Sequence, residues 1–192
     1  MICNGLYGAV GEASDEQIVH LFETNVLGSL RVARAAMPFL ITQGHGHIVQ
    51  LSSMAGHTSN PSIGLYSASK WAVEGAFEGL AKEVASFNIK LTLVEPGGIR
   101  TEFFVGNAVF GQAMEPYQDH PVGQFIRAMK SGGSNMATGD PRKMAREIIR
   151  CVARTTACCV WPWVADSYRA IRESLLSRLA RTGVVERTGL LY

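Results

Sequence analysis

The alternation of long amphipathic helices with short apolar segments constrains the fold of this chain more than any other feature. The segments from about residue 15 to 40 and from residue 64 to 87 both carry apolar residues at helical spacing. The first helix is followed by "HIVQLSS" and the second by "IKLTLVEPGG", two apolar runs of strand length. Helices that alternate with buried strands indicate an α/β fold with a parallel sheet and right-handed crossovers.

The whole chain, at 192 residues, has the length of one domain. Residues 100–140 are rich in Gly, Pro, Asn and Ser, and we expect an irregular loop there that serves as a lid over a substrate site. A third helix should start at Pro141 with Asp140 as its N-cap. A last strand is expected in "ACCVWPWVA", weakened by Pro162, before a terminal amphipathic helix.

Composition and charge exclude several classes of function. The formal net charge is +2 and the basic residues are scattered, which argues against a nucleic-acid partner. The apolar runs are too short to span a membrane, and the first ten residues do not resemble a signal peptide. The four cysteines form no C-x-x-C pair and the histidines lack metal-ligand spacing, so we expect reduced thiols, a cytoplasmic protein and no metal.

The strongest candidate for chemistry is the pair Tyr66 and Lys70, in "YSASK" near the start of the second helix. A tyrosine four residues before a lysine is a weak signal alone, because it also describes an ordinary surface contact. Its position gives it weight, since the helix follows a buried strand. In an open α/β sheet, the loops after the C-terminal ends of the strands form the ligand crevice.

Three other segments can join this pair, and each has a plain structural alternative. Ser53 ends the strand "HIVQLSS" and can hold a substrate oxygen, or only bond its own loop. Asn25 falls on the apolar side of the first helix, where an unpaired amide costs about 1–3 kcal/mol. It therefore needs a partner, a kink or a water. Pro96 and Gly97 turn the chain directly after a strand, which is also what a simple turn does.

Together these segments resemble the short-chain dehydrogenase/reductase family, over residues 5 to about 103. The resemblance rests on Asn25 in "TNVLG", Ser53 in "LSSMAG", Tyr66 and Lys70 in "YSASK", and Pro96-Gly97 before Thr101. "ETNVLG", "GHIVQLSS", "YSASKWAVEG" and "VEPGG" are similar to the branch with steroid and retinol dehydrogenases and related bacterial oxidoreductases. The family implies a Rossmann-type doubly wound sheet and a homo-oligomer formed through helices 15–40 and 64–87.

The resemblance also implies roles for these residues in interconverting an alcohol and a carbonyl. Tyr66 would be the general acid/base, because Lys70 and a positively charged nicotinamide lower the usual tyrosine pKa of about 10. Ser53 would bind the substrate oxygen, and Asn25 would anchor a water that relays protons from Lys70 to solvent. The residues implied to bind NAD or NADP are Tyr66, Lys70, Pro96, Gly97, Ile99 and Thr101.

The sequence departs from the family pattern at its N-terminal end. No Gly-x-x-x-Gly-x-Gly, the turn that cradles the cofactor pyrophosphate, precedes Asn25. The spacing of later glycines also argues against Asn4 as part of the family's Asn-Asn-Ala-Gly motif. We therefore expect a partial domain that lacks four of the seven usual strands, leaves an apolar sheet edge open and binds the cofactor poorly. A truncated enzyme is favoured over a short protein that has lost cofactor binding.

Two other functions and one substrate class follow from the sequence. Small residues on helix 64–87 would suit a non-catalytic oligomerisation or interaction module: Ala68, Ala72, Gly75, Ala76 and Gly79. A serine hydrolase at Ser53 is a poor match, because no G-x-S-x-G surrounds it. The expected lid has apolar residues that favour a lipophilic substrate, or alternatively form the lid's own core: Phe103, Phe104, Phe110, Met114 and Phe125.

Overall fold

The central element is a three-stranded parallel sheet with the strand order β2-β3-β5. The computed structural model describes residues 4–104, 106–132, 137–153, 160–163 and 165–187. The strands are β2 (Gly46–Leu51), β3 (Ile89–Pro96) and β5 (Val160–Trp163). The middle strand, β3, is buried on both faces over most of its length, including the polar Thr92 and Glu95. The expected α/β fold with a parallel sheet is confirmed.

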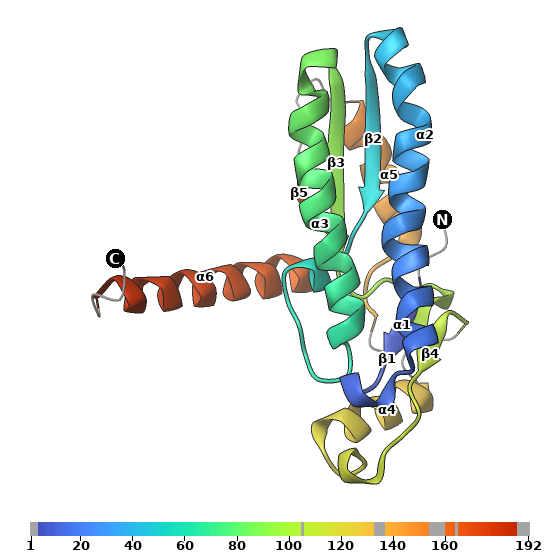
Figure 1. The fold of residues 1–192 in the computed structure, drawn as a ribbon, viewed down its shortest axis with the longest axis vertical. Coiled ribbons are helices and arrows are strands. Elements are labelled where there is room, and N and C mark those ends of the chain that lie inside the picture. The colour runs from blue at the N-terminus through green and yellow to red at the C-terminus, as the bar shows by residue number, and fades with distance from the viewer. Residues whose placement is uncertain (1–3, 105, 133–136, 154–159, 164, 188–192) are drawn as a thin grey trace.

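Helices cover both faces of this sheet. Helices α2 (Gly28–Gln43) and α3 (Gly64–Val84) lie on one face, and α5 (Pro141–Val152) lies on the other (Figure 1). Apolar residues of α2, of the turn that precedes it and of α3 meet β3 in a core of Val26, Ala33, Val73, Phe77, Leu91 and Leu93. The helical spacing of these apolar residues therefore predicts the face that each helix buries.

The first long helix is interrupted, although its sequence predicts one continuous helix. Helix α1 (Asp15–Phe22) is capped by Ser14, whose hydroxyl accepts from the Gln17 amide at 3.3 Å. A π-helical turn, Glu23–Leu27, then leads into α2. The turn contains the buried Asn25, and π-turns of this kind often occur at functional sites. The turn lies at the buried amide, where we expected a partner, a kink or a water.

The segment 100–140 is more ordered than its composition predicts. It contains β4 (Ala108–Phe110) and α4 (Pro121–Gly132), so the expectation of an irregular loop throughout is wrong. Helix α4 has apolar residues at helical spacing (Val122, Phe125, Ile126 and Met129), a pattern that the surrounding Gly and Ser obscured. Strand β4 pairs in parallel with β1 (Gly5–Tyr7) in a second, two-stranded sheet.

The C-terminal elements begin where the sequence predicts them. Asp140 caps α5 by accepting from the amides of Arg142 and Lys143 at 2.8 and 3.2 Å. Strand β5 contains Pro162, and α6 (Ala165–Arg187) then projects away from the body (Figure 1). Short 3-10 turns occupy Val10–Glu12, Met54–Gly56, Ala85–Phe87, Glu102–Phe104 and Glu115–Tyr117.

Three further expectations from the sequence concern the sheet edge at β2, the cysteines and membrane spans. Within the described residues, β2 pairs with β3 alone. Cys151 is buried and carries a free thiol, as expected, whereas the other three cysteines lie outside the described residues. No helix in the described part of the chain combines the length and the apolar character that crossing a membrane requires.

Candidate active site

A cavity of about 520 Å³ opens at the C-terminal ends of β2 and β3. Three segments that the sequence singled out reach its wall: the loop after β2, the first turns of α3 and the turn after β3. The predicted residues that line it are Ser53, Tyr66, Lys70, Pro96, Gly97, Ile99 and Thr101. Parallel strands end at the same edge of a sheet, and this brings residues far apart in the chain together.

Tyr66 and Lys70 lie side by side at the cavity wall. The Lys70 Nζ is 5.8 Å from the centroid of the Tyr66 ring and donates to the Leu51 carbonyl at 3.3 Å. Both residues are largely buried, at 8% and 3% exposure. A buried ammonium held by a backbone carbonyl is far from the solvent-facing pair that was the plain alternative. Its positive charge is available to stabilise negative charge on a neighbouring phenol oxygen.

Ser53 lines the cavity and also bonds its own loop. Its hydroxyl oxygen caps the 3-10 turn Met54–Gly56 by accepting from the Ala55 amide at 3.2 Å. A hydroxyl can accept and donate at the same time. The local bond therefore fixes the Ser53 oxygen at the end of β2 and leaves its proton for a ligand in the cavity.

Asn25 lies behind the cavity wall rather than in it. Its Oδ1 accepts from the Asn4 amide at 3.0 Å, and its Nδ2 donates to the Asn4 carbonyl at 2.9 Å. Nδ2 also donates at 3.1 Å to the Ser69 hydroxyl, which in turn donates to the Tyr66 carbonyl at 2.7 Å. The expected partner for this buried amide is therefore present. Asn25 connects the segment before β1 to the part of α3 that carries Tyr66.

The turn after β3 is closed by the start of α6. The Gly98 amide donates to Asp166 Oδ2 at 3.3 Å, and a side chain at Gly97 would collide with the Asp166 carboxylate. Further on, the Thr101 hydroxyl accepts from the Phe103 amide at 3.3 Å. Asp166 also lines the cavity, and no signal in the sequence marked it, because it lies far along the chain from β3.

The rest of the cavity lining is largely apolar and aromatic. Phe103 packs against the Tyr66 ring with centroids 5.6 Å apart, and Phe125 packs against Tyr7 at 6.4 Å. Met129 and Met144 also line the cavity. Tyr7 and both methionines were missed by the sequence analysis. The helical spacing within α4 was the signal that could have found Met129.

The other expected lid residues lie elsewhere. Phe110 packs against Tyr7 at 5.8 Å without lining the cavity, and Met114 is 44% exposed. The side chain of Phe104 lies outside the described part of the structure. The cavity has apolar lining residues, drawn from β1 and α5 as well as from the expected lid.

The chemistry of the wall suits the nicotinamide end of a cofactor. A nicotinamide riboside offers a flat ring, a polar amide and ribose hydroxyls. The cavity offers the ammonium of Lys70, the hydroxyl of Thr101 and the apolar side chain of Ile99, beside a glycine turn that leaves space. The sequence contains no Gly-x-x-x-Gly-x-Gly to cradle a pyrophosphate.

The chain is similar to known oxidoreductases in sequence. Residues 4–108 match the family model described as short chain dehydrogenase. Oxidoreductase BOA17 of Botryotinia fuckeliana is 41% identical over 129 residues, which are 67% of this chain and 46% of that protein. The 3-ketodihydrosphingosine reductase of Bacteroides thetaiotaomicron is 35% identical over 151 residues, 78% of this chain and 55% of that protein. The chain thus spans about half the length of the curated relatives it matches.

Solved structures agree with this likeness. A short-chain dehydrogenase from Streptomyces avermitilis superposes with a TM-score of 0.88 at 31% identity, covering 98% of this chain and 68% of that one. A gluconate 5-dehydrogenase from Burkholderia cenocepacia, crystallised with NADP and tartrate, gives a TM-score of 0.53 at 25% identity over 54% of this chain and 41% of that one. With the match over residues 4–108, these likenesses show that the chain belongs to the short-chain dehydrogenase family.

Proposed function

We propose that this chain carries the proton-transfer site of an NAD(P)-dependent oxidoreductase that interconverts an alcohol and a carbonyl. The observation that carries the proposal is the single cavity that Ser53, Tyr66 and Lys70 share with the turn after β3. A phenol beside a buried ammonium, next to a hydroxyl that can donate, is the set of groups that carbonyl reduction needs. Membership of the family and the fit of the wall to a nicotinamide support the choice of cofactor.

Tyr66 would move the proton. During reduction of a carbonyl, its phenol donates a proton to the substrate oxygen, and during oxidation of an alcohol it takes the proton back. The Lys70 ammonium stabilises the phenolate that remains. The Ser53 hydroxyl donates to the same substrate oxygen and holds it in position. The nicotinamide, when bound, exchanges a hydride with the carbon of that group.

Asn25 would act on the site through α3. Its amide connects Asn4 to Ser69, whose hydroxyl bonds the carbonyl of Tyr66. These bonds support a role in positioning the first turns of α3 against the cavity. The water relay from Lys70 to solvent, which the family resemblance implies, is part of the proposal and would use the acceptor capacity left on Asn25 Oδ1.

We propose a lipophilic alcohol or carbonyl as the substrate. The support is a set of cavity-lining residues made of aromatic rings and two methionines: Tyr7, Phe103, Phe125, Met129 and Met144. Burying an apolar substrate against such residues is favourable in proportion to the area removed from water. Methionine side chains also adapt to irregular apolar shapes.

The first experiment is a titration of the purified chain with NADH and with NADPH, followed by cofactor fluorescence. We expect weak binding by the 192-residue chain, because its sequence lacks the Gly-rich turn. A chimera that places the Gly-rich segment of a relative ahead of residue 4 should bind the cofactor and turn over medium-chain or isoprenoid alcohols. A chimera that binds cofactor but turns over no alcohol or carbonyl would contradict the proposal.

A second candidate function is self-association without catalysis. It is favoured by Val32 and Phe39, which are 72% and 77% exposed on α2, and by the exposed small residues Ala68 and Gly75 on α3. The charge-neutral variants Val32→Ser and Phe39→Ser should lower the mass measured by light scattering if α2 forms an interface between copies of the chain. An unchanged mass would remove the reason for this candidate.

A further inference from the structure

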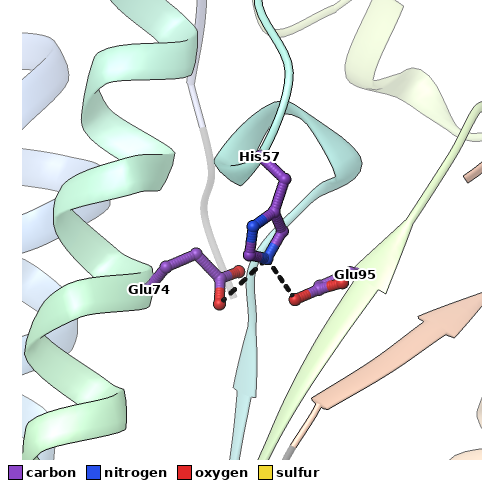
Figure 2. A group of neighbouring side chains, drawn as sticks. All are labelled: His57, Glu74 and Glu95. Atoms are coloured by element: carbon purple, nitrogen blue, oxygen red, sulfur yellow. Dashed lines mark hydrogen bonds and ion pairs between the residues drawn. The ribbon is translucent and has the colours of Figure 1, made fainter. Parts of the chain in front are cut away.

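A second polar cluster lies beside the active-site cavity without lining it. It consists of His57 from the loop after β2, Glu74 from α3 and Glu95 near the end of β3 (Figure 2). The His57 Nε2 is 2.8 Å from Glu95 Oε1 and 3.8 Å from Glu74 Oε2. One ligand atom from each residue can be chosen so that all three lie within 4.8 Å of one another. Three separate elements therefore aim nitrogen and oxygen donors at a common point.

The cluster buries two carboxyl groups beside one imidazole. Glu95 is fully buried and Glu74 is 8% exposed. Within the described residues, Glu74 Oε1 and Glu95 Oε2 are buried and have no hydrogen-bond partner. Burial raises the pKa of Glu74 to about 7, against an ordinary 4.5. Two buried carboxylates beside one imidazole are costly unless a cation or protons balance them.

Ser52 supplies an independent sign that a ligand belongs here. It is 4% exposed, and its hydroxyl has no partner at full hydrogen-bonding geometry among the described residues, although it lies close enough to Glu74 to oppose the rise in the pKa of that carboxyl. A Cβ placed on Gly56 would lie 3.1 Å from the Ser52 oxygen and 3.0 Å from Glu74 Oε1, so both atoms face the same small space. An unpartnered buried hydroxyl is costly, and a bound ion or its water would offset that cost.

We propose that His57, Glu74 and Glu95 bind one divalent transition-metal ion, with Zn²⁺ as the best fit and Ser52 or a water as the fourth ligand. Imidazole nitrogen and carboxylate oxygen bind Zn²⁺ at about 2.0–2.2 Å, whereas Mg²⁺ and Ca²⁺ select oxygen ligands in larger number. Ligands on one such ion lie about 3–4 Å apart. Small side-chain rotations would therefore convert the His57–Glu95 hydrogen bond into two metal bonds.

Protons compete with the ion for this cluster. The pKa of His57 is raised by its hydrogen bond to Glu95, opposed by burial, and further raised by the charges of Glu95 and Glu74. The charge of Arg178, which faces His57 from α6, acts in the opposite sense. Because the ligands must lose protons to bind a metal, the affinity should fall as the pH decreases below about 7.

The ion would tie together the segments that carry the candidate active site. His57 comes four residues after Ser53, Glu74 comes one helical turn after Lys70, and Glu95 directly precedes Pro96. Helix α6 is connected to these segments as well, because Ser174 Oγ and Arg178 Nη2 both donate to the His57 carbonyl at 2.7 Å. The expected role is structural, and metal binding itself does not depend on the proposed reaction.

The test is a Zn²⁺ titration of the tag-free chain after removal of metals with a chelator. A chromophoric chelator serves as the competitor, at pH about 8 and about 6. We expect one ion per chain, a higher unfolding temperature with Zn²⁺, and at least tenfold weaker binding at the lower pH. Failure of the chain to bind Zn²⁺ more tightly than a free-solution imidazole and carboxylate mixture would overturn the proposal.

Matched variants locate the ion. His57→Asn and Glu74→Gln should each weaken Zn²⁺ binding by about 100-fold or more. His45→Asn and Glu78→Gln, which change an exposed histidine and an exposed glutamate one turn along α3, should leave it unchanged. Binding that survives both cluster substitutions would overturn the proposal.

A spectroscopic readout keeps the test valid if a variant fails to fold. X-ray absorption of the Zn²⁺-loaded wild-type chain should show only nitrogen and oxygen ligands, with one imidazole. Sulfur ligands would assign the ion to the cysteines instead and would overturn the proposal.

Discussion

The candidate active site and the His57–Glu74–Glu95 cluster are built from the same three segments, yet their polar groups differ in hydrogen bonding and in access to a ligand. Helix α3 contributes Tyr66 and Lys70 to the cavity and Glu74, one turn further on, to the cluster. In the cavity, Lys70 is held by a carbonyl and the hydroxyl of Ser53 is held by its own loop. In the cluster, one carboxylate oxygen of Glu74 and one of Glu95 are buried without a hydrogen-bond partner among the described residues.

This difference in hydrogen bonding shows that neighbouring positions on the same segments can serve different functions. The cavity has space in front of its polar groups, so those groups can meet a molecule that enters. The carboxyl groups of the cluster are buried, so their charge must be balanced by protons, by neighbouring cations or by a bound ion. The predictions below separate these two behaviours.

The largest effect should come from removing the Tyr66 hydroxyl. Tyr66→Phe keeps the ring that packs on Phe103 but abolishes proton transfer, so kcat should fall by about 10²–10⁴-fold. The measurement is nicotinamide absorbance during turnover, in the cofactor-binding chimera. Glu74→Gln in the same chimera is the control from the cluster and should change kcat far less. Equal losses in both variants would show that the two regions act as one site.

The next effect is on substrate binding in the transition state. Ser53→Ala should lower kcat/KM by about 10²-fold, because it removes a donor to the reacting oxygen. The 3-10 turn that Ser53 caps would also lose one bond, worth about 1 kcal/mol of the free energy of unfolding. A thermal melt separates these effects. A loss of stability without loss of kcat/KM would leave Ser53 with its local role alone.

The pH dependence of stability should come from the cluster. A raised pKa in the folded state means that the stability contributed by Glu74 is complete below its unfolded value of 4.5 and is lost as the pH rises through about 7. The raised pKa of His57 acts in the same sense above 6.5. In metal-free buffer, the free energy of unfolding should therefore decrease between pH about 5 and 8, by on the order of 1–3 kcal/mol.

Urea unfolding across this pH range measures that slope. Glu74→Gln should remove most of it, whereas Glu78→Gln, at an exposed position of the same helix, should retain it. A wild-type stability that rises with pH over this interval would contradict the assignment of the burial cost to Glu74.

Effects of similar or smaller size should come from Gly56, which packs against α3, and Gly75, which lies within it. At Gly56 an added Cβ would lie 2.7 Å from Glu74 Cγ, so Gly56→Ala should destabilise the chain by about 1–3 kcal/mol. At Gly75 an added Cβ meets nothing within 4 Å, and Gly75→Ala should stabilise α3 by about 0.5–1 kcal/mol. Thermal melts of both variants would check this contrast. Equal effects would mean that the cluster tolerates an additional methyl group.

Several parts of the fold could be predicted because their signal is local. The strands β2 and β3 appear as apolar runs, and α3 and α5 appear as helical spacing with capping residues such as Asp140. The π-turn at Asn25 and the pairing of β1 with β4 could not be predicted in this way. A π-turn is stabilised by what its side chain meets, and a three-residue strand is too short to show a period.

The residues of the candidate site also fall into those that local sequence signals predict and those that only the packing of the fold brings together. The sequence by itself determined Ser53, Tyr66, Lys70 and the turn after β3 as a set, because strand ends and helix starts of a parallel sheet converge at one edge. Only the tertiary structure decided that Tyr7, Met129 and Asp166 complete the cavity. It also decided that a histidine and two glutamates, 38 residues apart from first to last, share one buried space. These contacts depend on how helices and strands pack across the fold, and the spacing of residues along the chain does not record that packing.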